Sequence, residues 1–188
     1  MLGATGMAGG IAVDNAFALG ASAVVAVGRN RGRLDALCER IARPALRTVR
    51  LSGSERSPIS DAIADALAGQ PPTIVIDFCW GAVAEAAFYA LGRSDLDTDD
   101  ADVLYVEVGA TAGADAVLPA ALLRSRRLTV RGSGLGGTPV TEIAARLPEL
   151  VELIAAGRVH VPYTAYPLSE VGAAWAANDG TRAVVVSG

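Results

Sequence analysis

Residues 1–10 read Met-Leu-Gly-Ala-Thr-Gly-Met-Ala-Gly-Gly, and this stretch decides how the rest of the chain is interpreted. Gly3, Gly6 and Gly9 form a G-x-x-G-x-x-G loop, a variant of the dinucleotide-binding fingerprint. Such a loop normally follows a β-strand and opens a helix, whose amino end attracts phosphate. A helix is expected over residues 7–20, but only two residues remain for the strand. We therefore expect a nucleotide-binding domain with a truncated first strand; a tight structural turn is the alternative.

The composition favours a folded domain and excludes several kinds of chemistry. The chain has 188 residues, of which 52% are apolar and 19% charged, enough for one domain or one domain with a small appendage. Its net charge of −4 gives no reason to expect a nucleic-acid partner. All 16 basic residues are Arg, which is typical of a GC-rich genome. The absence of Lys excludes a Walker-type phosphate Lys, a Schiff-base Lys and a Tyr-x-x-x-Lys pair.

The cysteines and the single histidine predict no metal site. Cys38 and Cys79 lie far apart, and His160 cannot complete a zinc-ligand pattern with them. A structural or exposed role is favoured for His160 over a proton shuttle. We see neither a signal peptide nor a membrane span, so we expect a reduced, cytoplasmic protein with no membrane partner.

Strands and helices alternate along most of the chain. Apolar runs typical of strands buried on both faces predict strands over 23–27 and 73–78. A weaker strand is expected over 46–51, and two more over 103–108 and 128–131. Apolar stripes at helical spacing predict helices between them, over 34–44, 57–69, 84–91, 118–124 and 141–156. Ser57 is expected to cap the second of these, with Pro58 in its first position. This βαβ series predicts the α/β class: a doubly wound parallel sheet, the Rossmann fold.

The end of the chain departs from this pattern. Residues 159–166 contain Pro162 and read as an extended edge segment, Ser169 is expected to cap a short helix, and 183–186 is expected as a lone strand. We therefore divide the chain into a dinucleotide-binding domain, residues 1–157, and an atypical C-terminal segment, residues 158–188, that belongs to a different sheet.

Two further expectations concern helix 141–156 and the acidic loop. Four apolar residues of the helix are expected to face inward: Leu147, Leu150, Val151 and Ile154. The loop over 93–102 is acidic, and four of its aspartates have the alternate spacing of a calcium loop; it is interpreted as a solvated turn, because it lacks the glycine and the terminal Glu. These residues are Asp95, Asp97, Asp99 and Asp100.

The end of the second strand points to the choice of cofactor. Proteins that bind NAD place Asp or Glu there, on the ribose 2′-hydroxyl. This chain instead reads Gly28-Arg29-Asn30, and Arg31 and Arg33 follow. A guanidinium can bind a 2′-phosphate through two hydrogen bonds, so Arg29 predicts a preference for NADP(H) over NAD. A solvated cluster of charges at a helix start is the alternative.

Three other stretches lie at carboxyl ends of strands, where ligands bind in open α/β sheets. They are Phe78-Cys79-Trp80-Gly81, Gly109-Ala110-Thr111 and Ser133-Gly134-Leu135. Ordinary strand-end turns are the alternative for each. No base near Cys79 could activate it as a nucleophile, and we assign no catalytic residue; Asp77 is expected only to orient a loop. The candidate cofactor-binding residues are Gly3, Thr5, Gly6, Met7, Ala8, Gly9, Gly28, Arg29, Asn30, Arg33, Phe78, Cys79, Trp80, Gly109, Ala110, Ser133 and Gly134.

The order and spacing of these motifs resemble the medium-chain dehydrogenase/reductase superfamily, especially its quinone oxidoreductases and zinc-type alcohol dehydrogenases. The matching stretches span the chain and are 3–9, 27–30, 73–77, 106–109, 128–132, 166–175 and 183–186. In that family a GroES-like catalytic domain precedes the cofactor domain, and the closing segment returns to it. The resemblance implies NADPH-dependent reduction of a carbonyl or quinone and a homodimer through the strand at 128–131. It also implies an incomplete chain that lacks the catalytic domain and any zinc which that domain holds.

Two other classes stay open. Atypical short-chain dehydrogenases and NmrA-like sensors also use Gly-Ala-Thr-Gly-x-x-Gly loops and an Arg after the second strand; residues 168–175 favour the medium-chain interpretation. A non-catalytic dinucleotide sensor, or a remnant of a truncated gene, is the other alternative.

Overall fold

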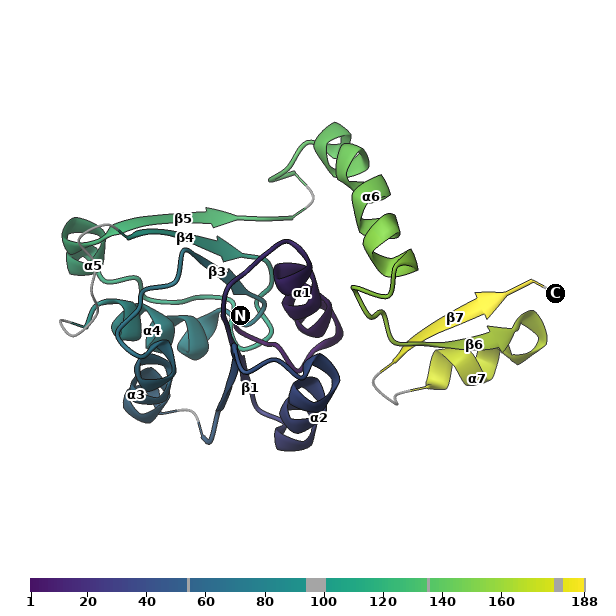
Figure 1. The fold of residues 1–188 in the computed structure, drawn as a ribbon, viewed down its shortest axis with the longest axis horizontal. Helices are drawn as coiled ribbons and strands as arrows, with labels where there is room; N and C mark the ends of the chain where they lie inside the picture. The colour runs from purple at the N-terminus through teal and green to yellow at the C-terminus, as the bar shows by residue number, and fades with distance from the viewer. Residues whose placement is uncertain (54, 94–100, 135, 178–180, 188) are drawn as a thin grey trace.

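The core of the molecule is a parallel β-sheet. Figure 1 shows the computed structural model, which describes residues 1–53, 55–93, 101–134, 136–177 and 181–187. The strands are β1 (Val24–Gly28), β2 (Leu46–Arg50), β3 (Ile74–Asp77), β4 (Asp102–Glu107) and β5 (Arg127–Gly132). β1 pairs with β2, and β3, β4 and β5 pair in that order, all in parallel. The predicted parallel sheet is therefore confirmed.

Leu2 joins the two groups of strands into one sheet. It forms isolated parallel bridges to Val27 of β1 and to Asp77 of β3. Its N–H donates to the carbonyl of Ile76 at 2.9 Å, and the N–H of Phe78 donates to its carbonyl at 3.2 Å. Leu2 thus occupies the position of the central first strand of a doubly wound sheet, and the order β2-β1-Leu2-β3-β4-β5 matches the Rossmann arrangement.

Helices cover both faces of the sheet (Figure 1). The first pair is α1 (Met7–Ala18) and α2 (Arg31–Ile41); the second is α3 (Arg56–Leu67) and α4 (Gly81–Leu91), and α5 (Ala120–Ser125) follows β4. Alternate residues of β1 serve the two cores: Val24 packs with α1 and α2, whereas Val27 packs with α3 and α4. Burial on both faces explains why the strands read as continuous apolar runs.

Two predicted helix caps are wrong. α3 begins two residues earlier than expected, with Glu55 at the N-cap position and no side-chain cap, so Ser57 lies inside the helix. Pro58 still fits, because the N–H groups of the first turn have no partner within the helix. In the C-terminal segment Ser169 lies within the short 3₁₀ turn η1 (Leu168–Glu170), and Glu170 precedes helix α7 (Val171–Ala176). Each serine therefore lies within two residues of the first residue of a helix but does not occupy its N-cap position.

The predicted inward face of the sixth helix is also wrong. α6 (Val140–Ala155) lies away from the sheet (Figure 1), and none of its residues is buried. Leu147 and Val151 are 50% and 60% exposed, Ile154 is 38% exposed, and Leu150 is half-buried. The stripe of apolar residues exists, but periodicity identifies an apolar face without identifying what covers it.

The last strand was expected to be unpaired, but the structure gives it a partner. β7 (Arg182–Val186) pairs in parallel with β6 (Tyr163–Pro167), and the two form a small sheet of their own. η1 and α7 connect them, as expected for a parallel crossover. This sheet lies apart from the main sheet (Figure 1). The four aspartates expected in an acidic turn, Asp95, Asp97, Asp99 and Asp100, and also Leu135, lie outside the described residues.

Candidate functional site

The glycine loop, residues 3–9, folds so that the backbones of Gly3 and Gly9 lie in close contact. Gly3 has a φ of +84°, which favours glycine. The N–H groups of Gly3 and Ala4 both donate to the carbonyl of Val27, at 3.0 and 2.9 Å. A Cβ atom on Gly9 would lie 2.1 Å from the carbonyl oxygen of Gly3, so no other residue fits there without displacing the loop. The loop therefore needs glycine at both positions for packing alone.

The amino end of α1 is open to an anion. Gly6 is the N-cap residue and offers no side-chain hydrogen bond, and the first turn contains no acidic residue. The first hydrogen bond of the helix runs from Gly10 N–H to the Gly6 carbonyl, so the N–H groups of Met7, Ala8 and Gly9 have no partner within the helix. These groups and the helix dipole favour a negatively charged ligand.

The end of β1 is tied to the glycine loop. A Cβ atom on Gly28 would lie 2.4 Å from Cγ2 of Thr5. Asn30 caps α2 by accepting the N–H of Arg33 at 3.0 Å, and the guanidinium of Arg33 donates to the Thr5 carbonyl at 3.2 Å. Arg29 is exposed at the same edge of the sheet. The structure thus brings together the two motifs that carried the prediction.

Asp77 organises the turn between β3 and α4, as the sequence predicted. Its carboxylate is fully buried and accepts the N–H groups of Cys79 and Trp80, at 2.7 and 3.0 Å. It also accepts the phenol O–H of Tyr105 at 2.6 Å. Burial, followed by the charge of Asp77, raises the pKa of the Tyr105 phenol, so Tyr105 is a hydrogen-bond donor here.

Backbone strain is concentrated in the same turn. Trp80 has φ 54° and ψ −157°, a conformation that side chains rarely adopt, and Gly81 follows with φ 56°. The Trp80 ring packs edge-on against Phe88 and Tyr105, with centroids 5.9 and 6.3 Å apart. Two hydrogen bonds to Asp77 and these ring contacts hold the strained turn at the carboxyl end of β3, beside the glycine loop.

Cys79 is a structural thiol. It is buried, and desolvation, followed by the charge of Asp77, raises its pKa. A nucleophilic cysteine needs a lowered pKa and access to solvent. A Cβ atom on Gly3 would lie 3.1 Å from the Cys79 sulfur and 3.2 Å from Cβ of Phe78, so the glycine loop and the β3 turn are direct neighbours.

The remaining strand-end residues line the same edge. The Thr111 hydroxyl donates to the Phe78 carbonyl at 2.9 Å, which joins the turn after β4 to that after β3. Gly109 and Ala110 begin the turn after β4, and Ser133 and Gly134 follow β5 at the margin of the sheet. Ser133 N–H donates to the Glu107 carbonyl at 2.7 Å. The candidate residues from five segments, the glycine loop and the turns after β1, β3, β4 and β5, therefore share one edge of the sheet.

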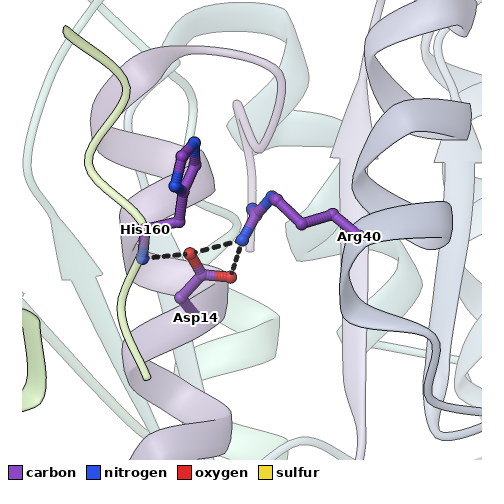
Figure 2. Close-up of polar contacts among 3 residues, drawn as sticks. All are labelled: Asp14, Arg40 and His160. Atoms are coloured by element: carbon purple, nitrogen blue, oxygen red, sulfur yellow. Dashed lines mark hydrogen bonds and ion pairs between the residues drawn. The ribbon is translucent and has the colours of Figure 1, made fainter. Parts of the chain in front are cut away.

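Sequence reasoning missed an ion pair next to the glycine loop, in which the carboxylate of Asp14 is buried and its arginine partner is not (Figure 2). Asp14 of α1 accepts from Arg40 of α2, with both carboxylate oxygens 2.6 Å from one guanidinium nitrogen. It also accepts the backbone N–H of His160 at 2.9 Å. The signal was a single acidic residue in an otherwise apolar stretch of helix. Arg40, His160 and Arg33 line one pocket with Thr5 and Gly6.

Within the described residues, no group of three or more His, Cys, Asp or Glu side chains is arranged to hold a metal ion. None of their helices is both long and apolar enough to cross a membrane.

Comparison with known proteins gives relatives along the whole chain. No protein-family model matches. The chain is 29% identical over 203 aligned residues to a protein named as a probable NADPH-dependent quinone reductase, tdiC of Emericella nidulans, and the match covers 99% of this chain and 53% of that protein.

Solved structures are also similar to this chain over nearly its whole length. An alcohol dehydrogenase zinc-binding domain protein from Burkholderia ambifaria is 25% identical over 93% of this chain, with a TM-score of 0.69, and is covered to 43%. The structure of AibC is 21% identical over 100% of this chain, with a TM-score of 0.76, and the match covers 48% of AibC. At this identity the likeness supports only the fold. The chain thus spans about half the length of the proteins it matches.

Proposed function

We propose that this chain is part of a member of the medium-chain dehydrogenase/reductase superfamily, binds NADP(H) and serves hydride transfer between the nicotinamide and a carbonyl or quinone. The observation that carries the proposal is the pairing of an open helix amino end at the glycine loop with an arginine in place of an acid at the end of β1. The fold and the NADPH-dependent relative support it. The nicotinamide itself would supply the hydride.

The residues present fit a dinucleotide phosphate. The free N–H groups of α1 and the side-chain-free surface of the loop are suited to the pyrophosphate. Arg29 is exposed and Arg33 is held by Thr5, so both guanidiniums can reach a 2′-phosphate at the end of β1. We assign the turns at 78–80, 109–110 and 133–134 to the nicotinamide half, because they lie along the same sheet edge.

The proposal also assigns roles to the two parts of the chain and to one edge of the sheet. We assign cofactor binding to residues 1–157, and contact with a substrate-bearing domain to residues 158–188, whose strands form a separate sheet. β5 is one of the two outer strands of the main sheet, and among the described residues its outer edge pairs with no other strand, so we assign this edge to a homodimer.

Calorimetry with NADPH and NADH tests the cofactor assignment. NADPH is expected to bind at least about tenfold more tightly than NADH, because a bidentate arginine–phosphate contact is a strong charge-assisted bond. Arg29→Asp should remove this preference. Arg146→Asp makes the same charge change on α6, at a side chain that is 84% exposed and pairs with Glu149, and should leave both affinities unchanged. Equal affinities in the unmodified protein would refute the NADP(H) assignment.

Hydride transfer requires a separate assay. NADPH oxidation, followed by absorbance, is measured against a panel of quinones and aldehydes. Turnover that depends on the substrate supports an oxidoreductase, and binding of NADPH without turnover by any substrate favours a dinucleotide sensor.

A further inference from the structure

The turn between β3 and α4 is joined to the turn after β4 by backbone hydrogen bonds. The carbonyl of Phe78 accepts the N–H of Thr111 at 3.4 Å, in addition to the hydroxyl of the same residue. The next carbonyl, of Cys79, accepts Ala112 N–H at 2.7 Å. Successive carbonyls of one turn thus bind successive residues of the other, and the two turns hold each other in place.

The same two turns are also in close steric contact. A Cβ atom on Gly81 would lie 2.9 Å from backbone atoms of both Ala112 and Gly113, so only glycine fits there without displacing the second turn. Residues 78–81 and 109–113 therefore form one packed unit, which we call the paired turns. A change in the backbone of one turn must move the other.

Trp80 occupies the least favourable backbone conformation of the paired turns. Its φ of 54° with ψ of −157° is accessible to glycine but costly for a residue with a side chain. The carbonyl of Cys79 belongs to the peptide unit that precedes Trp80, and φ of Trp80 helps to set the direction of this carbonyl. The hydrogen bond to Ala112 therefore depends on the strained conformation.

The indole ring anchors Trp80 to the core. It packs edge-on against Phe88 of α4 and Tyr105 of β4, whose own ring centroids lie 4.8 Å apart. These two rings are 1% and 0% exposed, so they cannot move without opening the core. Aromatic contacts of this geometry stabilise a structure beyond the area they bury. The ring therefore opposes relaxation of the backbone at Trp80.

Steric fit alone does not explain a tryptophan at this position. Glycine would adopt the same backbone conformation without strain, but it would also leave the turn free to adopt others. Trp80 adds a fixed point, because its ring is held on two elements of the fold. Strained residues that their surroundings hold in this way are concentrated at functional sites.

We propose that Trp80 is a positioning residue of the cofactor site, whose ring holds the paired turns in the shape that the nicotinamide half of the dinucleotide requires. This inference rests on the proposed function, which assigns these turns to the nicotinamide half. The glycine loop is held separately, by the bonds of Gly3 and Ala4 N–H to the Val27 carbonyl. The ring should therefore affect binding of one half of the cofactor and spare the other.

Calorimetry with two ligands tests this division. NADPH is compared with 2′,5′-ADP, which carries the adenosine 2′-phosphate but no nicotinamide. Trp80→Leu removes the ring and leaves a side chain that disfavours positive φ. It is expected to weaken NADPH binding about tenfold or more, because the turns must then be ordered on binding, and to change the affinity for 2′,5′-ADP by less than about twofold. Trp80→Phe, which restores a ring, should recover most of the NADPH affinity.

Tyr89→Leu is the matched control, because it removes an aromatic ring from the same helix at a side chain that is 47% exposed. It should leave both affinities unchanged. Hydrogen exchange at the Ala112 amide, followed by NMR, gives a measurement that needs no ligand. Exchange should be about tenfold faster in Trp80→Leu than in Tyr89→Leu, because the bond to the Cys79 carbonyl opens more often.

The outcomes separate this inference from the proposed function. Equal losses of affinity for both ligands in Trp80→Leu, or no loss for NADPH, would overturn the role of Trp80 and leave NADP(H) binding standing. An unmodified protein that binds neither ligand would overturn the proposed function and this inference with it. If Trp80→Leu does not fold, the unmodified protein decides: NADPH alone should slow exchange at Ala112, and equal slowing by 2′,5′-ADP, or slowing by neither ligand, would overturn the inference.

Discussion

Tyr105 donates its phenol hydrogen to the carboxylate of Asp77 at 2.6 Å, and both side chains are fully buried. This bond links β4 to the carboxylate that holds the strained turn at Trp80. The core of the sheet and the geometry of the candidate nicotinamide edge therefore depend on the same pair.

Tyr105→Phe removes this donor and leaves a buried carboxylate with one partner fewer. We expect the free energy of unfolding to fall by about 1–3 kcal/mol. Urea denaturation measures it. Tyr89→Phe is the matched control, because Tyr89 is 47% exposed and should change stability by less than about 0.5 kcal/mol. Equal effects of the two variants would contradict the assigned role of the pair.

The thiol of Cys79 is expected to react slowly because burial raises its pKa. In a Cys38→Ser background, alkylation by iodoacetamide at pH 8 should be much slower in the folded protein than in urea. Mass spectrometry follows the reaction. Because the folded pKa lies above the unfolded value of roughly 8.5, the stability it contributes is complete below that pH and is lost as the pH rises toward the folded pKa. Fast alkylation of the native protein at pH 8 would show that Cys79 is accessible and activated.

Substitution of adjacent glycines separates loop packing from helix propensity. Gly9→Ala places a Cβ 2.1 Å from the Gly3 carbonyl oxygen and should destabilise the protein by about 1–3 kcal/mol and weaken NADPH binding. Gly10→Ala meets only the Ala4 carbonyl at 3.7 Å and should stabilise α1 by roughly 0.5–1 kcal/mol. Thermal melts and calorimetry measure both. The prediction fails if Gly9→Ala is tolerated as well as Gly10→Ala.

Asp14→Ala should loosen the C-terminal segment from α1. The variant leaves Arg40 without its carboxylate and the His160 N–H without its acceptor. Because the Arg40 side chain is 35% exposed and stays hydrated, the cost is about 1–3 kcal/mol. Asp35→Ala removes an exposed ion pair with Arg31 and should cost less than about 1 kcal/mol.

Limited proteolysis gives a second measurement on these two variants. Cleavage near residues 157–162 should be faster for Asp14→Ala than for Asp35→Ala, because Asp14, unlike Asp35, accepts the His160 N–H. Similar cleavage rates would show that other contacts anchor the segment.

Much of the fold could be predicted because it follows from local patterns. Ile59, Ile63 and Leu67 recur at helical spacing and are buried on one face of α3. The apolar run at 24–27 predicts a strand covered on both faces, and the structure buries β1 on both faces. The expected elements were displaced by a few residues at their ends, as at Ser57, because several residues near a helix start can serve as its first.

The residues of the candidate site were foreseen to different degrees. The glycine loop and Arg29 were identified because spacing and charge type are written in the sequence. Asp14 with Arg40, and Asp77 with Tyr105, involve partners 26 and 28 residues apart, and no local pattern connects them.

By itself, the sequence determined the alternating α/β order, the parallel sheet and a loop whose glycines permit close backbone contact, because propensity, periodicity and steric limits act over a few neighbouring residues. Only the tertiary structure decided that the α6 stripe lies uncovered, that β7 pairs with β6, and that Asp14 ties His160 to α1. Those features depend on which surfaces meet, and that is fixed by packing between residues distant in the chain.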